Sequence, residues 1–263
     1  MIKLQDQNND GLSIVIPCFN SIETISDVLK SIYIQEIDCP YEIIIIDDGS
    51  TLPVKHFAEH KKVRYYYKNN SGVSGARNFG VNKAIYKYIC FIDSDDIWTE
   101  GKIRYQLKLI RLYKLPFLGT SFDNKSYFNK NYLYKISPNI LPLRWWPHIS
   151  TVIIEKDLFN NIGKFDESMK YAEDGDFLMR VAKSNNLYVT SYNGVRRAIH
   201  KLSNYESGLS SNITRMYYGE IKIIGRYINS IPYKILLIVF ISSKLLIRIA
   251  TYVIQRISNV LNK

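Results

Sequence analysis

The sequence predicts an α/β fold in which a mostly parallel sheet is flanked by helices. Three observations support this fold class. Apolar strand-like runs alternate with helical stretches about every 20 to 30 residues, as they do in βαβ units. The runs at 41–46 and 88–92 are apolar almost throughout, which is typical of central strands covered on both faces. Both runs end in aspartates, which should lie at the carboxyl edge of the sheet because a buried strand cannot hold unpaired carboxylates.

The first half of the chain is expected to supply the parallel strands. A helix is expected at 24–33, where Val28 and Ile32 recur at helical spacing. A loop rich in glycine and polar residues at 69–78 leads into a second helix that runs through Ala84. Right-handed crossovers would place the loops that follow the strands on one rim. The expected strands are 12–17, 41–46, 63–67 and 88–92.

The second half is expected to be less regular. Helices are expected at 100–113 and 157–161, with a strand at 150–154. The stretch 116–147 lacks long periodic runs, so we expect short strands and a flexible loop over the site there. A further helix opens at Glu173, where acidic residues in the first turn are also what a helix dipole favours.

The strand at 88–92 ends in three carboxylates, Asp93, Asp95 and Asp96. Clustered oxygen ligands suit Mg²⁺ or Mn²⁺, whose other positions are filled by substrate phosphates and water. The alternative is a solvated acidic turn that caps the next helix. This stretch therefore predicts a divalent cation site and leaves a purely structural role open.

The composition narrows the function classes. The chain has 263 residues and a net charge of +11, which suits an anionic membrane surface, a phosphorylated substrate or nucleic acid. Its three cysteines show no CxxC spacing, so neither a disulfide framework nor a zinc site is expected. Residues 1–11 are polar and lack the pattern of a signal peptide, so we expect a cytoplasmic protein.

The segment that follows Pro232 predicts an amphipathic basic helix. Its five basic residues fall within roughly 120° of a helical wheel, and residues 231–263 contain no acid. The longest uncharged stretch, 235–243, is too short for the about 20 residues that span a bilayer. The helix could lie in the headgroup region of an anionic membrane with its basic residues outward. Packing on the protein or in a homodimer is the alternative.

Six motifs in this order resemble those of family 2 glycosyltransferases, which have the Rossmann-like GT-A fold. The resemblance covers about residues 12–205. The motifs are IVIPCFN at 14–20, IDDGS at 46–50, Gly72 with GARN at 75–78, FIDSDD at 91–96, GKFDE at 163–167, and Glu173-Asp174.

The resemblance implies a site for a nucleoside-diphosphate sugar. Asp48 matches the carboxylate that holds the nucleotide base, with Asp47 as the second candidate, and Arg77 would lie near the diphosphate unless it is a surface arginine. Asp93 resembles the ribose ligand and Asp95 the metal ligand. The remaining residues expected to border the donor are Pro17, Asn20, Gly72 and Ser94.

The resemblance also implies the catalytic group. Asp174 corresponds to the general base, with Glu173 beside it, and a single base without a covalent intermediate inverts the anomeric configuration. A hydroxyl needs such a base because its pKa lies far above that of a carboxylate. His200 resembles a histidine that reaches the metal or the phosphates, although a lone histidine is also a common surface or core residue.

We therefore expect an inverting, metal-dependent hexosyltransferase. It would move a sugar from a nucleoside-diphosphate donor, with a UDP-sugar favoured, to an acceptor hydroxyl. A lipid-linked oligosaccharide or lipopolysaccharide intermediate at the inner face of a bacterial membrane is the expected acceptor. A nucleotidyltransferase would need a glycine-rich basic loop after the first strand, where the chain has PCFN at 17–20. A basic nucleic-acid-binding protein is the non-enzymatic alternative, but an acidic rim argues against nucleic acid as a partner.

The resemblance divides the chain into three expected parts. A polar extension at 1–11 precedes the GT-A domain at 12–215. This domain has a nucleotide-binding half at 12–98 and an acceptor half at 99–215. The C-terminal helical region at 216–263 would hold the protein on the membrane surface.

Overall fold

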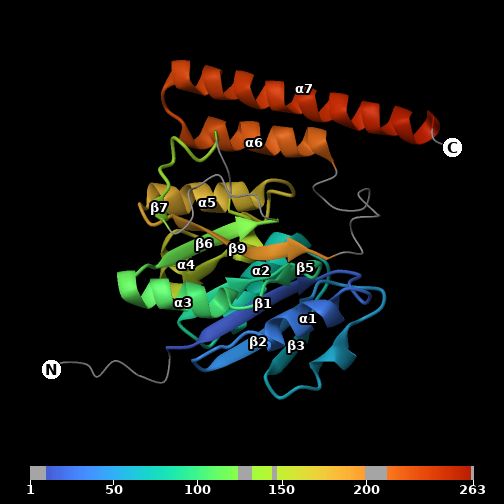
Figure 1. Cartoon of the computed structure of the whole chain (residues 1–263), viewed down its shortest axis with the longest axis vertical. Helices are drawn as coiled ribbons and strands as arrows, with labels where there is room; N and C mark the ends of the chain where they lie inside the picture. The colour runs from blue at the N-terminus through green and yellow to red at the C-terminus, as the bar shows by residue number, and fades with distance from the viewer. Residues whose placement is uncertain (1–9, 124–131, 144–146, 199–211, 262–263) are drawn as a thin grey trace.

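The computed structural model describes residues 10–123, 132–143, 147–198 and 212–261, with side chains described as far as residue 247. Figure 1 shows the elements stacked in layers, with the N-terminal strands at one end of the molecule and the C-terminal helices at the other. One large sheet lies between helices that cover both of its faces. The expected α/β fold with C-terminal helices is confirmed.

The first half of the chain forms the parallel part of the sheet. Its strands are β1 (Leu12–Cys18), β2 (Tyr41–Asp47), β3 (Val63–Tyr67) and β4 (Tyr88–Phe91). β1 is central, since it pairs in parallel with β2 on one side and with β4 on the other. β3 pairs in parallel with β2. The carboxyl ends of these strands therefore share one rim, as the sequence predicts.

The second half extends the sheet with mixed pairing. The added strands are β5 (Asp96–Trp98), β6 (Phe117–Phe122), β7 (Leu133–Lys135), β8 (Ile153–Glu155) and β9 (Tyr188–Arg197). β8 pairs antiparallel with both β4 and β6, and β9 runs parallel to β6 but antiparallel to β5 and β7. The strand expected at 150–154 is only partly correct, because a 3₁₀ turn at Ile149–Thr151 precedes β8.

Alternating residues of β1 divide the core into two layers. Ile14 and Ile16 face one apolar cluster with α1 (Ile25–Tyr33) and α3 (Lys102–Tyr113). Val15 faces the other cluster, which buries α2 (Gly72–Lys83), α4 (Lys156–Asn161) and α5 (Glu173–Lys183). This period of two is what a strand covered on both faces requires.

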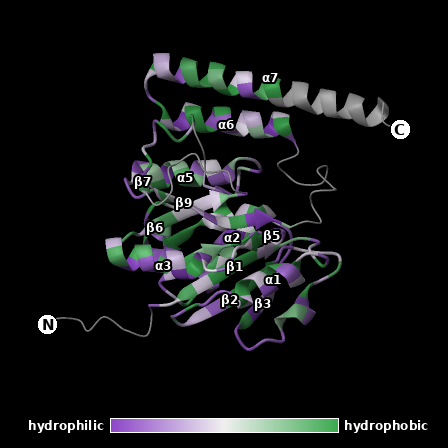
Figure 2. Ribbon diagram, viewed as in Figure 1, coloured by the Kyte–Doolittle hydropathy of each residue, from purple (hydrophilic) through white to green (hydrophobic). Residues whose placement is uncertain are grey.

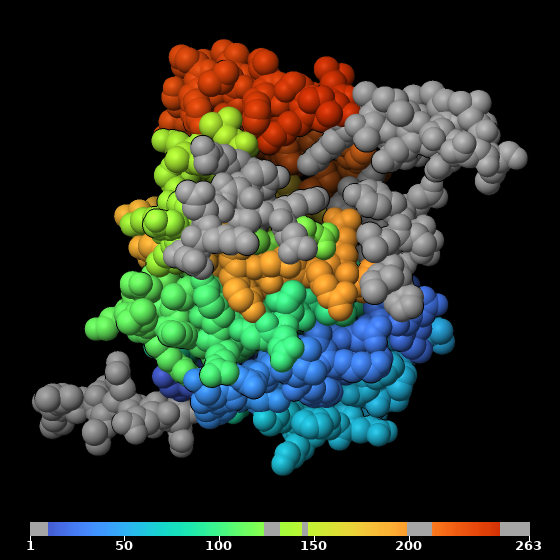
Figure 3. Space-filling view, viewed as in Figure 1, coloured from blue at the N-terminus to red at the C-terminus, as the bar shows by residue number. Residues whose placement is uncertain are grey.

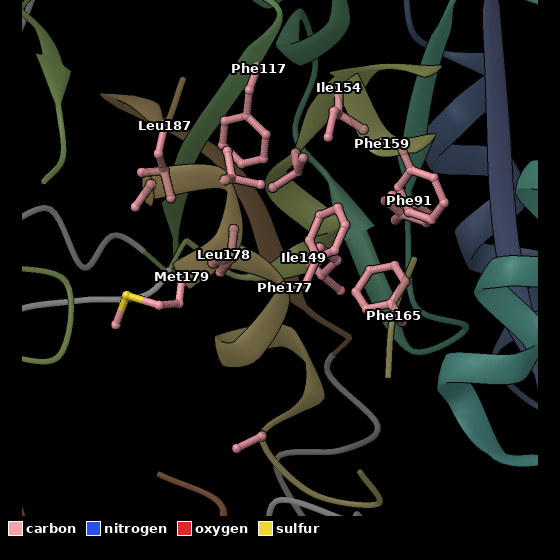
Figure 4. Packing of buried hydrophobic residues seen from close by; sticks show 14 of the residues in the cluster. Phe91, Phe117, Ile149, Ile154, Phe159, Phe165, Phe177, Leu178, Met179 and Leu187 are labelled. Atoms are coloured by element: carbon pink, nitrogen blue, oxygen red, sulfur yellow. The ribbon is translucent and has the colours of Figure 1, made fainter. Parts of the chain in front are cut away.

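Four phenylalanines hold the second layer together close to the rim. Phe165 and Phe177 stack with ring centroids 4.4 Å apart, and Phe165 meets Phe91 of β4 edge-on at 5.5 Å. Phe159 of α4 completes the group, and Figure 4 shows these rings gathered beside Ile149 and Ile154. The turn at 163–167 and the start of α5 are thereby fixed against the strand that carries the acidic cluster.

Two C-terminal helices, α6 (Ile213–Tyr227) and α7 (Ile231–Leu261), stack outside α5. The expected helix after Pro232 is present and begins at Ile231. The boundary expected after residue 215 lies inside α6. Within the residues that the structure describes, none of the helices is both long enough and apolar enough to cross a membrane.

Candidate active site

The loops after β1 and β2 are joined to each other at the rim. Asn20 has a left-handed backbone with φ 51°, and its side-chain oxygen accepts 3.0 Å hydrogen bonds from the backbone N–H and the hydroxyl of Thr51. The backbone N–H of Asn20 donates to the Ser50 hydroxyl at 2.8 Å. Pro17 is buried in β1, where it stands opposite Ile46 of β2. Of this pair, Asn20 is the one exposed at the rim.

Asp47 is fully buried and serves the fold. Its carboxylate accepts hydrogen bonds from the Ser50 N–H at 3.0 Å, from the Val54 N–H at 3.3 Å and from the Tyr65 hydroxyl at 2.8 Å. These partners close the turn after β2 and tie it to β3. A carboxylate engaged in this way is a turn-forming group.

Asp48 holds the start of α2. Its carboxylate accepts from the backbone N–H groups of Ser71 and Gly72 at 3.0 and 2.8 Å, and Lys68 donates to it at 2.6 Å. Gly72 has φ +84°, a left-handed conformation that glycine adopts without steric cost. The Ser71 hydroxyl lies a further 3.5 Å from this carboxylate, and the Asp48 side chain is buried, so its acceptor sites are largely engaged within the protein.

Arg77 lies in the interior instead of on the helix surface. Its side chain is 4% exposed, and its guanidinium donates to Asp93 at 2.7 Å and to Glu173 at 3.0 Å. The two carboxylates raise the pKa of Arg77 against the effect of burial. The small neighbours Ser74, Gly75 and Ala76 on α2 indicate in the sequence that this helix is tightly packed.

The acidic cluster follows β4 as expected. Asp93, Ser94 and Asp95 are half-buried. The Ser94 hydroxyl lies 2.6 Å from that of Ser21, which follows β1, so the cluster and the first loop are in contact. The backbone carbonyl of Asp95 accepts from Ala198 at 3.2 Å, which brings the end of β9 to the same place.

Asp93, Asp96 and His148 form a group that could hold a cation. Their ligand atoms all lie within 4.8 Å of one another. Asp96 is buried, its carboxylate accepts from the Ser150 hydroxyl at 2.6 Å, and burial raises its pKa to about 6. Carboxylate oxygens and an imidazole nitrogen suit Mn²⁺, so the residues present fit a divalent cation. Sequence reasoning missed His148, which sits at the end of the aperiodic stretch before the 3₁₀ turn.

Glu173 and Asp174 open α5 at the same rim. Glu173 is buried, and burial followed by the charge of Asp174 raises its pKa to about 7 although Arg77 opposes the shift. Asp174 is half-buried, and its carboxylate accepts from the Gly175 N–H at 2.8 Å. The structure therefore brings Glu173 and Asp93 together through Arg77, as neighbours of one site. His200 lies outside the described residues.

α6 packs directly against the start of α5. A Cβ atom at Gly219 would come within 2.8 Å of both the Tyr171 carbonyl oxygen and the Ala172 Cβ. Ala172, which precedes Glu173, has a left-handed backbone with φ 57°. One turn further on, Asp176 accepts 2.9 Å hydrogen bonds from Arg226 and Tyr227 of α6. The C-terminal helices thus hold the segment that carries the candidate catalytic pair.

The model of the family described as Glycosyl transferase family 2 matches residues 13–171. The chain belongs to this family. A glycosyltransferase of Rickettsia conorii, RC0461, is 32% identical to this family 2 glycosyltransferase over 191 residues. That alignment covers 68% of this chain and 31% of the relative, so the chain spans about a third of the length of that relative.

A second relative is similar along most of its length. The Escherichia coli protein WfgD, named UDP-Glc:alpha-D-GlcNAc-diphosphoundecaprenol beta-1,3-glucosyltransferase, is 24% identical over 230 residues. The match covers 83% of this chain and 87% of WfgD.

A solved structure shares the fold. The mannosyltransferase PcManGT from Pyrobaculum calidifontis, in complex with GDP-Man and Mn²⁺, superposes with a TM-score of 0.65 at 14% identity. The superposition covers 95% of this chain and 79% of PcManGT. The expected GT-A fold and the family 2 resemblance are both confirmed.

Proposed function

We propose that the protein is an inverting glycosyltransferase that moves a sugar from a nucleoside-diphosphate donor to an acceptor hydroxyl. A UDP-sugar is the favoured donor. The observation that carries the proposal is the bridge made by Arg77. It holds a carboxylate of the acidic cluster, Asp93, and a carboxylate of the candidate catalytic pair, Glu173, on one guanidinium. Donor and base would therefore meet at one point of the rim.

In this proposal Asp174 accepts the proton of the acceptor hydroxyl. Its half-buried carboxylate lies at the first turn of α5, next to Glu173. The pKa of about 7 means that Glu173 carries a proton for part of the time near neutrality, so the pair does not hold two full negative charges. The proton leaves the hydroxyl as the bond to the anomeric carbon forms, and one base suffices for inversion.

The donor would lie along the ends of β1, β2 and β4. As the family resemblance implies, Asp48 would receive an N–H of the base, and Asp93 would receive the ribose hydroxyls. Asn20, Gly72 and Ser94 line the same rim and would border the nucleotide. Both terminal nitrogens of Arg77 are engaged, so it would not contact the diphosphate and would instead offset the negative charge of Asp93 and Glu173 beside it.

A divalent cation, Mn²⁺ or Mg²⁺, would be held at the acidic cluster, where it would neutralise charge on the departing diphosphate. Two ligand sets are open to it. The family resemblance favours Asp95 together with His200. The geometry of the described residues favours Asp93, Asp96 and His148.

The proposed acceptor is a lipid-linked glycan at the cytoplasmic face of the cell membrane. The name of WfgD specifies a diphosphoundecaprenol-linked acceptor and a UDP-Glc donor for that protein. The net charge of +11 on this chain suits the anionic surface where such an acceptor lies.

Calorimetric titration with UDP and with GDP, each in Mn²⁺ and then in EDTA, tests the proposal. We expect UDP to bind in Mn²⁺ and to bind much more weakly in EDTA. Tight binding of GDP instead would change the donor base, as the GDP-Man complex of PcManGT illustrates for that protein. Binding of neither nucleotide would contradict the proposed donor site.

A further inference from the structure

Ser150 contacts every member of the candidate cation group. The group consists of Asp93, Asp96 and His148. The Ser150 hydroxyl donates a 2.6 Å hydrogen bond to the carboxylate of Asp96 and accepts one of 3.0 Å from the backbone N–H of Asp93. The backbone N–H of Ser150 donates to Nδ1 of His148 at 3.4 Å. One residue of the 3₁₀ turn therefore joins this turn to the acidic cluster after β4.

The direction of the hydrogen bonds at the Ser150 hydroxyl is fixed. A backbone N–H can only donate, so the N–H of Asp93 takes a lone pair of the hydroxyl oxygen. The hydroxyl has a single proton, and it donates this proton to Asp96. The carboxylate of Asp96 is thereby held in one orientation relative to the backbone of Asp93.

The imidazole of His148 is held from two sides. Its Nδ1 accepts from Ser150, and its ring stacks on that of Phe122 with centroids 4.4 Å apart. Figure 2 shows hydrophobic residues in β6, the strand that ends at Phe122. Nδ1 also lies 3.4 Å from a carboxylate oxygen of Asp96. A 3.4 Å hydrogen bond is weak, so the bond from Ser150 orients the ring and a cation can replace it at Nδ1.

Ser150 is itself fixed by the fold. It is fully buried, and its backbone carbonyl accepts a 3.0 Å hydrogen bond from the indole N–H of Trp98. Trp98 belongs to β5, which pairs with β9, and Figure 3 shows β9 at the surface between α3 and the C-terminal helices. Hydrogen bonds that are shielded from solvent are electrostatically stronger than those in water. The fold therefore sets the position of Ser150, and Ser150 in turn orients the candidate cation group.

We propose that Ser150 is a positioning residue that holds the candidate cation group in the arrangement that binds Mn²⁺ or Mg²⁺. Ser150 itself would not touch the cation. This role deepens the proposed function and rests on it, since the cation would serve the donor diphosphate. Residues that orient metal ligands through hydrogen bonds typically change metal affinity by about 10–100-fold when they are replaced.

Titration of the full chain with Mn²⁺ tests this role, with free Mn²⁺ followed by electron paramagnetic resonance, first without nucleotide and then with saturating UDP. Ser150→Ala should weaken Mn²⁺ binding by about 10–100-fold. Ser150→Thr keeps the hydroxyl and should restore most of the affinity. Ser121→Ala is the matched control and should bind Mn²⁺ like the wild type. Ser121 is 1% exposed, and its hydroxyl has no hydrogen-bond partner among the residues that the structure describes.

Urea unfolding without Mn²⁺ separates this role from a purely structural one. A residue that serves only the fold would lower the free energy of unfolding when replaced and would leave the Mn²⁺ affinity of the folded protein unchanged. Wild-type Mn²⁺ affinity in Ser150→Ala would therefore overturn the proposal. Equal losses in Ser150→Ala and Ser150→Thr, or a wild type that binds no Mn²⁺ with or without UDP, would overturn it too.

A second variant keeps the test decisive if Ser150→Ala does not fold. Trp98→Phe keeps an aromatic ring and removes the indole N–H that holds the Ser150 carbonyl. The Mn²⁺ affinity of this variant should be lower than that of the wild type. An unchanged affinity would assign Ser150 to the fold alone.

Titration with UDP distinguishes failure of this role from failure of the proposed function. Mn²⁺ binding that Ser150→Ala weakens, without UDP binding by the wild type, would remove the proposed donor site and leave the role of Ser150 in place. UDP binding of equal strength in Mn²⁺ and in EDTA, without bound Mn²⁺, would do the reverse.

Discussion

Arg77 on α2 and Glu173 on α5 are 96 residues apart in the chain, and the guanidinium of the first donates a 3.0 Å hydrogen bond to the carboxylate of the second. The same guanidinium donates to Asp93 at 2.7 Å. The ring of Phe165 lies under it, with the guanidinium carbon 5.3 Å from the ring centroid. One buried cation therefore joins the acidic cluster after β4 to the first turn of α5.

Replacing Arg77 by methionine should destabilise the protein by about 3–5 kcal/mol, because it leaves buried carboxylates without their cation. Urea unfolding at pH 8 measures the change. Arg104→Met is the matched control, since the Arg104–Glu36 pair is 68% and 71% exposed and exposed pairs contribute little. Equal effects of the two substitutions would show that the bridge has no special role in stability.

The pKa of Glu173 predicts a pH dependence of stability. Its pKa is raised from 4.5 to about 7 by burial and by the charge of Asp174. The folded state therefore holds this proton more tightly than the unfolded state. The stabilising contribution is complete below pH 4.5 and is lost as the pH rises through 7.

Glu173→Gln removes that titration. The free energy of unfolding of the wild type relative to this variant should fall by about 2–3 kcal/mol between pH 4.5 and pH 8. The comparison cancels the contribution of Asp96, whose pKa is raised to about 6 by its own burial. A wild-type-minus-variant difference that stays constant with pH would contradict the raised pKa.

Asp174→Asn should lower the rate of sugar transfer by about 10²–10⁴-fold, which is the usual contribution of a general base. Donor binding should change little, because the substitution conserves shape and lies on α5. Turnover in sugar-transfer assays and titration with UDP measure the two effects. Asp157→Asn, an acidic residue in the first turn of α4, is the control and should transfer normally. Normal turnover of Asp174→Asn would reject the proposed base.

The two candidate ligand sets for the cation can be told apart by paired variants. If Asp95 is a ligand, Asp95→Ala removes the Mn²⁺-dependent part of UDP binding and His148→Ala leaves it. If the cation is held by Asp93, Asp96 and His148, His148→Ala removes the Mn²⁺-dependent part of UDP binding and Asp95→Ala retains it. Calorimetry in Mn²⁺ and in EDTA measures that part. Retention by both variants would exclude both sets.

The rim was predictable from the sequence because the interior of a strand cannot hold unpaired carboxylates, and β2 and β4 end at or just before Asp47 and Asp93. The partners of these residues were not predictable. Asp48 caps α2 only because the fold brings Ser71 and Gly72 to its carboxylate. Such long-range contacts leave no local periodicity.

The contacts of His148 and of α7 could not be predicted from the sequence either. His148 lies 3.4 Å from Asp96 in a fold where β8 pairs antiparallel with β4, and the stretch before His148 has no periodic pattern. For α7 the helical period predicted the helix correctly. It could not show which side faces α6, because the segment is apolar around most of its circumference.

The close approach of α6 to the start of α5 predicts the effect of Gly219→Ala. The new Cβ would meet the Tyr171 carbonyl oxygen and the Ala172 Cβ at 2.8 Å, so that α6 or the residue preceding Glu173 must shift. We expect a loss of stability of about 1–3 kcal/mol, as overpacking typically costs, and a lower kcat with unchanged donor binding. Gly225→Ala on the same helix is the matched control, because its Cβ would meet nothing within 4 Å and alanine favours the helix by about 0.5–1 kcal/mol. A stable, fully active Gly219→Ala would show that the C-terminal helices do not position the catalytic pair.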